Sequence, residues 1–145
     1  MTEIKQTFTD TAGTAVGEIV AKVHFSNKVK RITLRLSGVI IGENAELLKE
    51  FLKNISCFPA NDWSLDLKRV STISLRGVKA LSRLAVAVRK KGTVLRLTNS
   101  NAIVLALLQE MDFLHFFDQR AISEKAKGYT ETFSKSIQAN QSERP

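Results

Sequence analysis

The sequence has little of what stabilises or identifies many small proteins. Among 145 residues there is a single cysteine, Cys57, so no internal disulfide can form, and there are only two prolines. The longest apolar run, residues 102–108, is far shorter than the ~20 residues that a membrane-spanning helix needs. The opening residues MTEIKQTFTDTAG have neither a basic start nor an apolar core, so we expect no secretory signal. These absences predict a cytoplasmic protein without a membrane span.

Catalytic and metal-binding patterns are also missing. Neither of the glycine-rich phosphate-binding patterns, GxGxxG and GxxxxGK[ST], occurs. His24 and His115 have no acidic or cysteine partner at metal-ligand spacing, and Asp66 is a single carboxylate without a second one for acid–base work. We therefore expect no enzymatic activity, no metal and no cofactor.

Positive charge is in excess and is concentrated in one region. The net charge is +8, and residues 61–98 hold nine Lys or Arg against two Asp or Glu. Such a region attracts an acidic protein, a nucleic acid or an anionic membrane surface, although a solvated helix face would have the same composition. Aromatic residues do not alternate with these cations, so no stacking platform for bases is formed, and nucleic acid is an unlikely partner.

Apolar periodicity predicts strands and helices in alternation. Alternating apolar residues indicate strands at 17–25, 29–40, 63–70 and 93–100, with the first two forming a hairpin. Helical spacing indicates helices at about 42–56, 75–91 and 101–117, the last capped by Ser100 or Asn101. Strands that alternate with helices in this way predict an α/β fold with helices against a mixed sheet.

The same patterns divide the chain into three parts. Residues 1–16 are polar and rich in threonine and glycine, and they are predicted to be a flexible N-terminal arm. Residues 17–118 contain all the predicted strands and helices and form one domain. Residues 119–145 are predicted to be a polar C-terminal tail, partly helical or disordered.

One junction has unusual contents, the stretch STISLRGVKAL at residues 71–81, where a strand is expected to give way to a helix. Ser74 is placed to cap that helix, which stabilises it by ~1 kcal/mol. Arg76 is unfavourable there by ~0.3–1 kcal/mol, because the start of a helix carries positive potential. The helix has an apolar seam and a separate basic face, made respectively of Val78, Leu81, Ala85 and Val88 and of Arg76, Lys79, Arg83 and Lys90.

The order of these segments resembles a STAS domain, the module of anti-sigma-factor antagonists, stressosome proteins and anion-transporter tails. Several pieces match the family pattern in sequence order: LDLKRV (Leu65 to Val70), Ile73, Gly77 with Ala80 and Leu81, VLRLTN after Gly92, and LLQEMDFLHFF in the last helix. LRLSGVI (Leu34 to Ile40) is similar to an earlier family segment. The resemblance covers roughly residues 17–118. It implies a STAS-like fold, with a mixed sheet of four to five strands and helices mainly on one face.

The resemblance is broken at the junction. Where the family has Asp-Ser-Ser-Gly, this chain has Ser74-Leu75-Arg76-Gly77. The family's first serine is the residue that a partner kinase phosphorylates, and Leu75 stands there without a hydroxyl. The resemblance therefore implies a domain held in the unphosphorylated, partner-binding state. Ser74 and Ser71 are alternative phosphosites, and the basic residues around them would attract a phosphate.

The resemblance implies a non-enzymatic regulatory module of bacterial type that works by protein–protein contact, as anti-sigma-factor antagonists do. We expect its partner-binding residues to be Ser74, Leu75, Arg76, Gly77, Lys79 and Arg83. The implied partner is an anti-sigma kinase, another STAS protein or an acidic regulator. An alternative is that the basic face of residues 68–91 binds an anionic ligand, such as a nucleotide, a lipid headgroup or a nucleic acid. A third alternative is a homo-oligomer.

Overall fold

The computed structural model describes residues 1–117, which form a five-stranded sheet with helices packed on it. The strands lie in sequence order across the sheet: β1 (Thr2–Thr9), β2 (Ala15–Phe25), β3 (Lys30–Ile40), β4 (Asp62–Ile73) and β5 (Leu95–Ser100). β1, β2 and β3 pair antiparallel, whereas β3, β4 and β5 pair parallel. The predicted α/β fold with a mixed sheet and the predicted β2–β3 hairpin are both confirmed.

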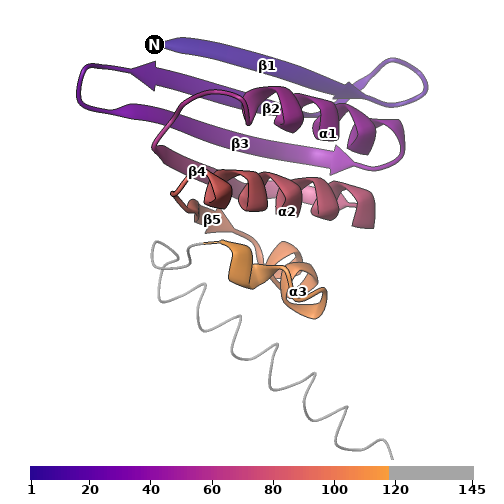
Figure 1. Cartoon of the computed structure of the whole chain (residues 1–145). Helices are drawn as coiled ribbons and strands as arrows, with labels where there is room; N and C mark the ends of the chain where they lie inside the picture. The colour runs from indigo at the N-terminus through magenta and orange to yellow at the C-terminus, as the bar shows by residue number, and fades with distance from the viewer. Residues whose placement is uncertain (118–145) are drawn as a thin grey trace, which may run out of the picture.

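Two of the helices are the crossovers that parallel strands require. α1 (Glu43–Ile55) joins β3 to β4, α2 (Leu75–Lys90) joins β4 to β5, and α3 (Ala102–Glu110) follows β5. α1 and α2 lie side by side across one face of the sheet, and α3 lies near β5 (Figure 1). Because β3 and β4 are parallel, the first turns of α1 and α2 begin at the same edge of the sheet.

One apolar core lies between the sheet and these helices. Alternate residues of the central strands are completely buried, among them Ile32, Leu34 and Leu36 of β3 and Trp63, Leu65 and Leu67 of β4. The predicted seam of α2 is equally buried at Val78, Leu81, Ala85 and Val88. The opposite face of the sheet is polar and includes a shallow recess lined by Lys22, Thr33, Arg35 and Asp66, among others.

The prediction of a flexible arm at residues 1–16 is wrong. Thr2–Thr9 form β1, which pairs antiparallel with β2 from Thr2 opposite Val23 to Thr9 opposite Ala15. β1 lies at the edge of the sheet, so one face of this strand and its outer backbone edge remain in water. Few apolar residues are therefore needed in its sequence. Phe8 is completely buried and Ile4 is half-buried, while the other side chains are polar.

The last predicted helix is shorter than its apolar pattern suggests. Asn101 caps α3 as expected, since its Oδ1 accepts a hydrogen bond from the Val104 N–H at 2.9 Å. α3 ends at Glu110, because Asp112 adopts a left-handed conformation (φ 58°) and the Phe113 N–H donates to the Leu108 carbonyl at 2.8 Å, which closes the helix end. A short 3₁₀ turn, η1 (Leu114–Phe116), follows. The predicted tail at 119–145 lies outside the described residues.

Candidate functional site

The junction between β4 and α2 is a tightly bonded turn. Ser74 follows β4 directly, and its N–H donates to the Ile40 carbonyl at the end of β3 at 2.9 Å. The Ser74 Oγ accepts from the Gly77 N–H at 3.3 Å, and the Ser74 carbonyl accepts from Val78 at 3.0 Å. Ser74 is therefore the N-cap of α2, as predicted, and its hydroxyl is used in holding the turn.

Gly77 is buried beneath this turn instead of lying on its surface. A Cβ at position 77 would lie 2.7 Å from Cγ1 of Ile73 and 3.4 Å from Cγ2 of Ile40. α2 thus starts so close to the ends of β3 and β4 that only a glycine fits without displacing a neighbour. The expectation that Gly77 contacts a partner is not supported by its position, since it is covered by its own chain.

Leu75 is the most conspicuous side chain of the turn. It is the first residue of α2 and is 55% exposed. Two other large apolar side chains are exposed at the same edge of the sheet: Ile41, which follows β3, at 49%, and Ile103, near the start of α3, at 63%. Each of the three parallel strands is therefore followed within a few residues by an exposed apolar side chain.

Arg76 lies next to Leu75 and pairs with the neighbouring helix. Its guanidinium is 3.2 Å from the carboxylate of Glu46, which belongs to the first turn of α1. A cation at a helix start is unfavourable on its own, and the Glu46 carboxylate offsets it. The sequence could not predict this contact, because it depends on α1 and α2 lying side by side.

Lys79 and Arg83 extend the site along α2. With Leu75, Arg76 and Ala80 they line a hollow of about 470 Å³ whose far wall is Glu46 and Lys49 of α1. The structure thus brings four of the six predicted contact residues, Leu75, Arg76, Lys79 and Arg83, to one surface. It also adds Lys49 from α1, a residue that the sequence did not indicate.

The two alternative phosphosites differ in their surroundings. Ser71 lies on the last part of β4 and is exposed, as are Lys68 and Arg69 before it. Ser74 is half-buried and is occupied as the cap of α2. Ser71 is therefore the more accessible of the two hydroxyls, and two exposed cations precede it in the sequence.

The predicted basic face of residues 68–91 is not one uniform surface. Lys91 turns back to the end of α1, where its Nζ donates to the carbonyls of Ser56 and, at 3.1 Å, Phe58. A cation at this position stabilises the helix, because the end of a helix carries negative potential. Arg89 donates to the His115 carbonyl at 3.3 Å. These two cations therefore have structural contacts at the far end of α2.

The opposite face of the sheet has a partly exposed ion cluster that the sequence did not reveal. The Asp62 carboxylate lies between Arg31, at 2.9 Å, and Arg96, at 2.6 Å. Burial works to raise the pKa of Asp62, but hydrogen bonds from both guanidiniums, together with their charges, outweigh it and hold the pKa below its ordinary value. This ion cluster links β3, β4 and β5, and we assign it a structural role.

Metal-ligating side chains do not gather in the described part of the chain. Among residues 1–117, no three of the histidine, cysteine, aspartate and glutamate side chains come close enough to hold a metal ion. Asp66, the one carboxylate considered for acid–base work, accepts hydrogen bonds from the Lys68 N–H at 3.0 Å and the Asn99 side chain at 3.3 Å. No helix in this range has the length and apolar character to cross a membrane.

The family model of the STAS domain matches residues 20–128. This match covers most of the chain and includes β3, β4, β5 and the helices between them. The chain belongs to the STAS family. STAS domains are regulatory and interaction modules and are generally non-catalytic.

Comparison with individual proteins adds little to this assignment. The chain is similar to the solved structure of the murine Solute Carrier 26 family member A9 anion transporter in its inward-facing state, with 19% identity and a TM-score of 0.48. The similarity covers 69% of this chain and 18% of the transporter chain, so this STAS domain spans less than a fifth of that protein. No curated protein matches the chain.

Proposed function

We propose that this STAS domain is a non-enzymatic regulatory module of the anti-sigma-factor-antagonist type, and that it binds a cytoplasmic protein partner through the start of α2. The observation that supports this most strongly is Leu75, an apolar side chain that is 55% exposed at the first position of α2. About half of this side chain is still in water, so burying the remainder in an interface contributes roughly 1–1.5 kcal/mol.

The position of Leu75 also bears on regulation. Leu75 stands where the family motif has a phosphorylatable serine, so no kinase can add a charge there. A phosphate at a helix start brings nearly two negative charges and would change the surface from neutral to anionic. The proposed domain is therefore constantly competent to bind, with Arg76, Lys79 and Arg83 selecting a partner that carries acidic residues.

Substitutions at the turn test the proposal without disturbing the core. The tagged full-length chain is cross-linked in its native cell and purified with its partners, as wild type and as Leu75→Asp and Arg76→Glu. Phe25→Asp and Lys30→Glu are matched controls, because both residues are exposed at the opposite edge of the sheet. We expect the turn variants to lose at least one partner that both controls retain. Equal capture by all five proteins would remove the proposed surface.

The alternative function, binding of an anionic ligand to the basic face of residues 68–91, has a different signature. Affinity for such a ligand would come almost entirely from charge, so it would fall steeply between low and moderate salt. Titration of the chain with nucleotides, anionic lipid vesicles and short nucleic acids at both salt concentrations tests it. An absence of binding at low salt excludes this alternative.

A further inference from the structure

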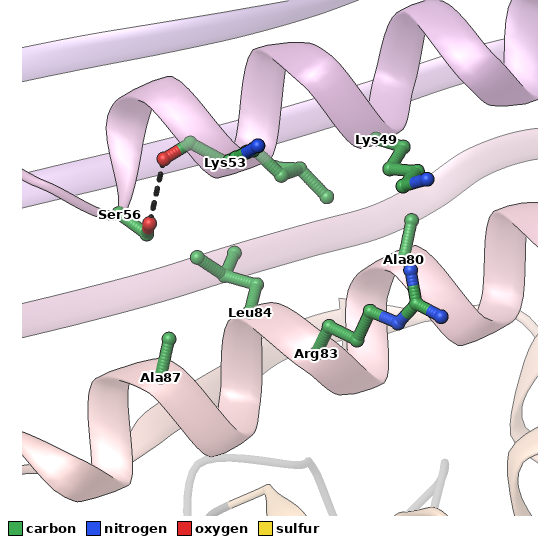
Figure 2. Close-up of a pocket in the computed structure, with 8 residues that line it drawn as sticks. Lys49, Lys53, Ser56, Ala80, Arg83, Leu84 and Ala87 are labelled. Atoms are coloured by element: carbon green, nitrogen blue, oxygen red, sulfur yellow. Dashed lines mark hydrogen bonds between the residues drawn. The ribbon is translucent and has the colours of Figure 1, made fainter.

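A continuous groove runs between α1 and α2 and extends the site described above. A space of about 330 Å³ lies between two walls (Figure 2). One wall is lined by Lys49, Leu52 and Lys53 of α1 and by Ser56 just after it, and the other by Ala80, Arg83, Leu84 and Ala87 of α2. This space shares Lys49, Ala80 and Arg83 with the hollow beside Leu75 and Arg76. The α1–α2 groove, as we name the two together, therefore starts at the proposed partner surface.

The floor of the α1–α2 groove is apolar and is shaped for close contact. Leu52, Ala80 and Leu84 are buried at its base, and Ala87 is half-buried. Ala80, Leu84 and Ala87 all project from α2 toward α1 in Figure 2. Alanine at two of these three positions leaves room for another backbone to approach, since the distance between packed helices is set by the side chains at their contact.

The rims of the groove are strongly basic. Lys49 and Lys53 stand on the α1 side, and Arg76, Lys79 and Arg83 on the α2 side, against one carboxylate, that of Glu46. Glu46 is already engaged by Arg76 at 3.2 Å and lies 4.0 Å from Lys49. Among residues 1–117, Lys53, Lys79 and Arg83 make no ion pair within 4.0 Å. An occupant of this groove is therefore expected to carry several negative charges.

The walls are poorly suited to a small anion such as a phosphate. Along the part of the groove lined by Lys49, Lys53, Leu84 and Ala87, both walls are the flanks of helices, where each backbone N–H is bonded within its own helix. Phosphate sites in proteins usually add the unpaired N–H groups of a loop or a helix start, which these flanks do not offer. The combination of basic rims with an apolar floor matches a longer occupant, which has acidic residues on its sides and apolar residues beneath.

We infer that the α1–α2 groove is the docking site for an acidic amphipathic helix of the partner protein. The wall from Glu46 to Ser56 is about 15 Å long at 1.5 Å per residue, which corresponds to a helix of about three turns. Leu52 and Leu84 are already covered, so apolar side chains of that helix, spaced at three and four residues, would lie on half-buried Ala87 and on the aliphatic stems of the flanking cations. Its carboxylates would reach Lys49, Lys53 and Arg83. This inference rests on the proposed function and adds the chemistry of the partner.

A designed peptide tests the groove directly. The probe is a fluorescein-labelled 14-residue peptide, stapled as a helix, with leucines along one face and glutamates beside them. Two control peptides are used. One has lysine in place of each glutamate, and the other has the same composition with the leucines at scrambled positions. Fluorescence anisotropy with the full chain is expected to show the acidic amphipathic peptide binding at least tenfold more tightly than either control peptide.

Variants of the full chain then locate the binding. The double variant Lys49→Glu with Lys53→Glu is expected to bind the acidic peptide at least tenfold more weakly than wild type. The double variant Lys49→Ala with Lys53→Ala is expected to bind it at least threefold more weakly. Lys22→Glu combined with Arg35→Glu is the matched control, with the same charge change on the opposite face of the sheet, and is expected to leave the affinity within twofold. Circular dichroism checks that each variant is folded.

Several results would overturn the inference. These are absence of peptide binding, equal binding of the scrambled isomer, and equal weakening by the control pair, which would show only long-range attraction. Displacement of the peptide by inorganic phosphate or phosphatidylglycerol vesicles at submillimolar concentration would assign the groove to a phosphate-bearing ligand. Light scattering would assign the groove to a second copy of the chain if it showed a dimer for wild type and a monomer for the variant with both Lys49→Glu and Lys53→Glu. In each case, loss of the native partner in Leu75→Asp would still support the proposed function.

Discussion

The Arg76 guanidinium lies 3.2 Å from the Glu46 carboxylate, so the second residue of α2 is tied to the first turn of α1. Both side chains are about half exposed or more, and such pairs contribute roughly 0.2–1 kcal/mol. A double-mutant cycle of Glu46→Ala and Arg76→Ala in urea unfolding is expected to give a coupling in this range that shrinks as salt is added. A coupling above about 2 kcal/mol would mean that the pair is far better shielded from water than its exposure indicates.

Gly77→Ala is expected to destabilise the fold. Alanine is normally favoured over glycine inside a helix by about 1 kcal/mol. Here the new Cβ would lie 2.7 Å from Cγ1 of buried Ile73, and overpacking of that kind costs about 1–3 kcal/mol. Urea unfolding followed by circular dichroism measures the balance, with Lys79→Ala on the exposed face of α2 as the control. A gain in stability for Gly77→Ala would contradict the close packing of α2 on the strand ends.

Substitutions at Ser74 separate the contribution of helix capping from the effect of a phosphate-like negative charge. Ser74→Ala removes the oxygen that accepts from the Gly77 N–H and is expected to lower the free energy of unfolding by about 1 kcal/mol. Ser74→Asp keeps an acceptor and adds a negative charge at a helix start, so it is expected to retain most of the stability. Thermal and urea unfolding of both variants check this. An equal loss of stability in Ser74→Ala and Ser74→Asp would show that the hydroxyl has another role.

Asp62 is expected to make stability depend on pH on the acid side. Arg31 and Arg96 hold the pKa of Asp62 below its ordinary value, so the folded state binds its proton less readily than the unfolded state does. The stabilisation is fully present above the unfolded value of about 4 and is lost as the pH falls through the lower folded value. Urea unfolding between about pH 2 and pH 6 is expected to show Asp62→Asn less stable than wild type at the upper end of this range, with the gap closing toward low pH. A gap independent of pH would contradict the role of the carboxylate charge.

The central strands and helices could be predicted because their side chains alternate between core and water. Leu65 and Leu67 in β4 and the seam from Val78 to Val88 in α2 lie on the buried face that their spacing indicates. β1 escaped prediction because an edge strand buries so little that Phe8 alone is completely covered. The end of α3 at Glu110 was also missed, since the apolar pattern continues while the backbone at Asp112 turns back.

The candidate site could be predicted only where it is local in sequence. The capping of α2 by Ser74 and the exposure of Leu75 follow from their places at the start of a helix. The contributions of Glu46, Lys49 and Lys53 could not be foreseen, because nothing in the sequence of α1 indicates which face will meet α2. The groove is a product of packing between two segments about thirty residues apart.

Site-specific photo-cross-linking at Leu75 tests the central claim most directly. A photoreactive phenylalanine analogue is placed in the full chain at position 75 or, as control, at position 25, and the chain is irradiated in its native cell. A protein captured from position 75 is purified, and its affinity is measured for wild type, Leu75→Asp and Phe25→Asp. We predict capture from position 75 alone, with affinity at least tenfold weaker for Leu75→Asp and unchanged for Phe25→Asp. Equal capture from both positions, or an affinity that Leu75→Asp leaves unchanged, would contradict a partner surface at the start of α2.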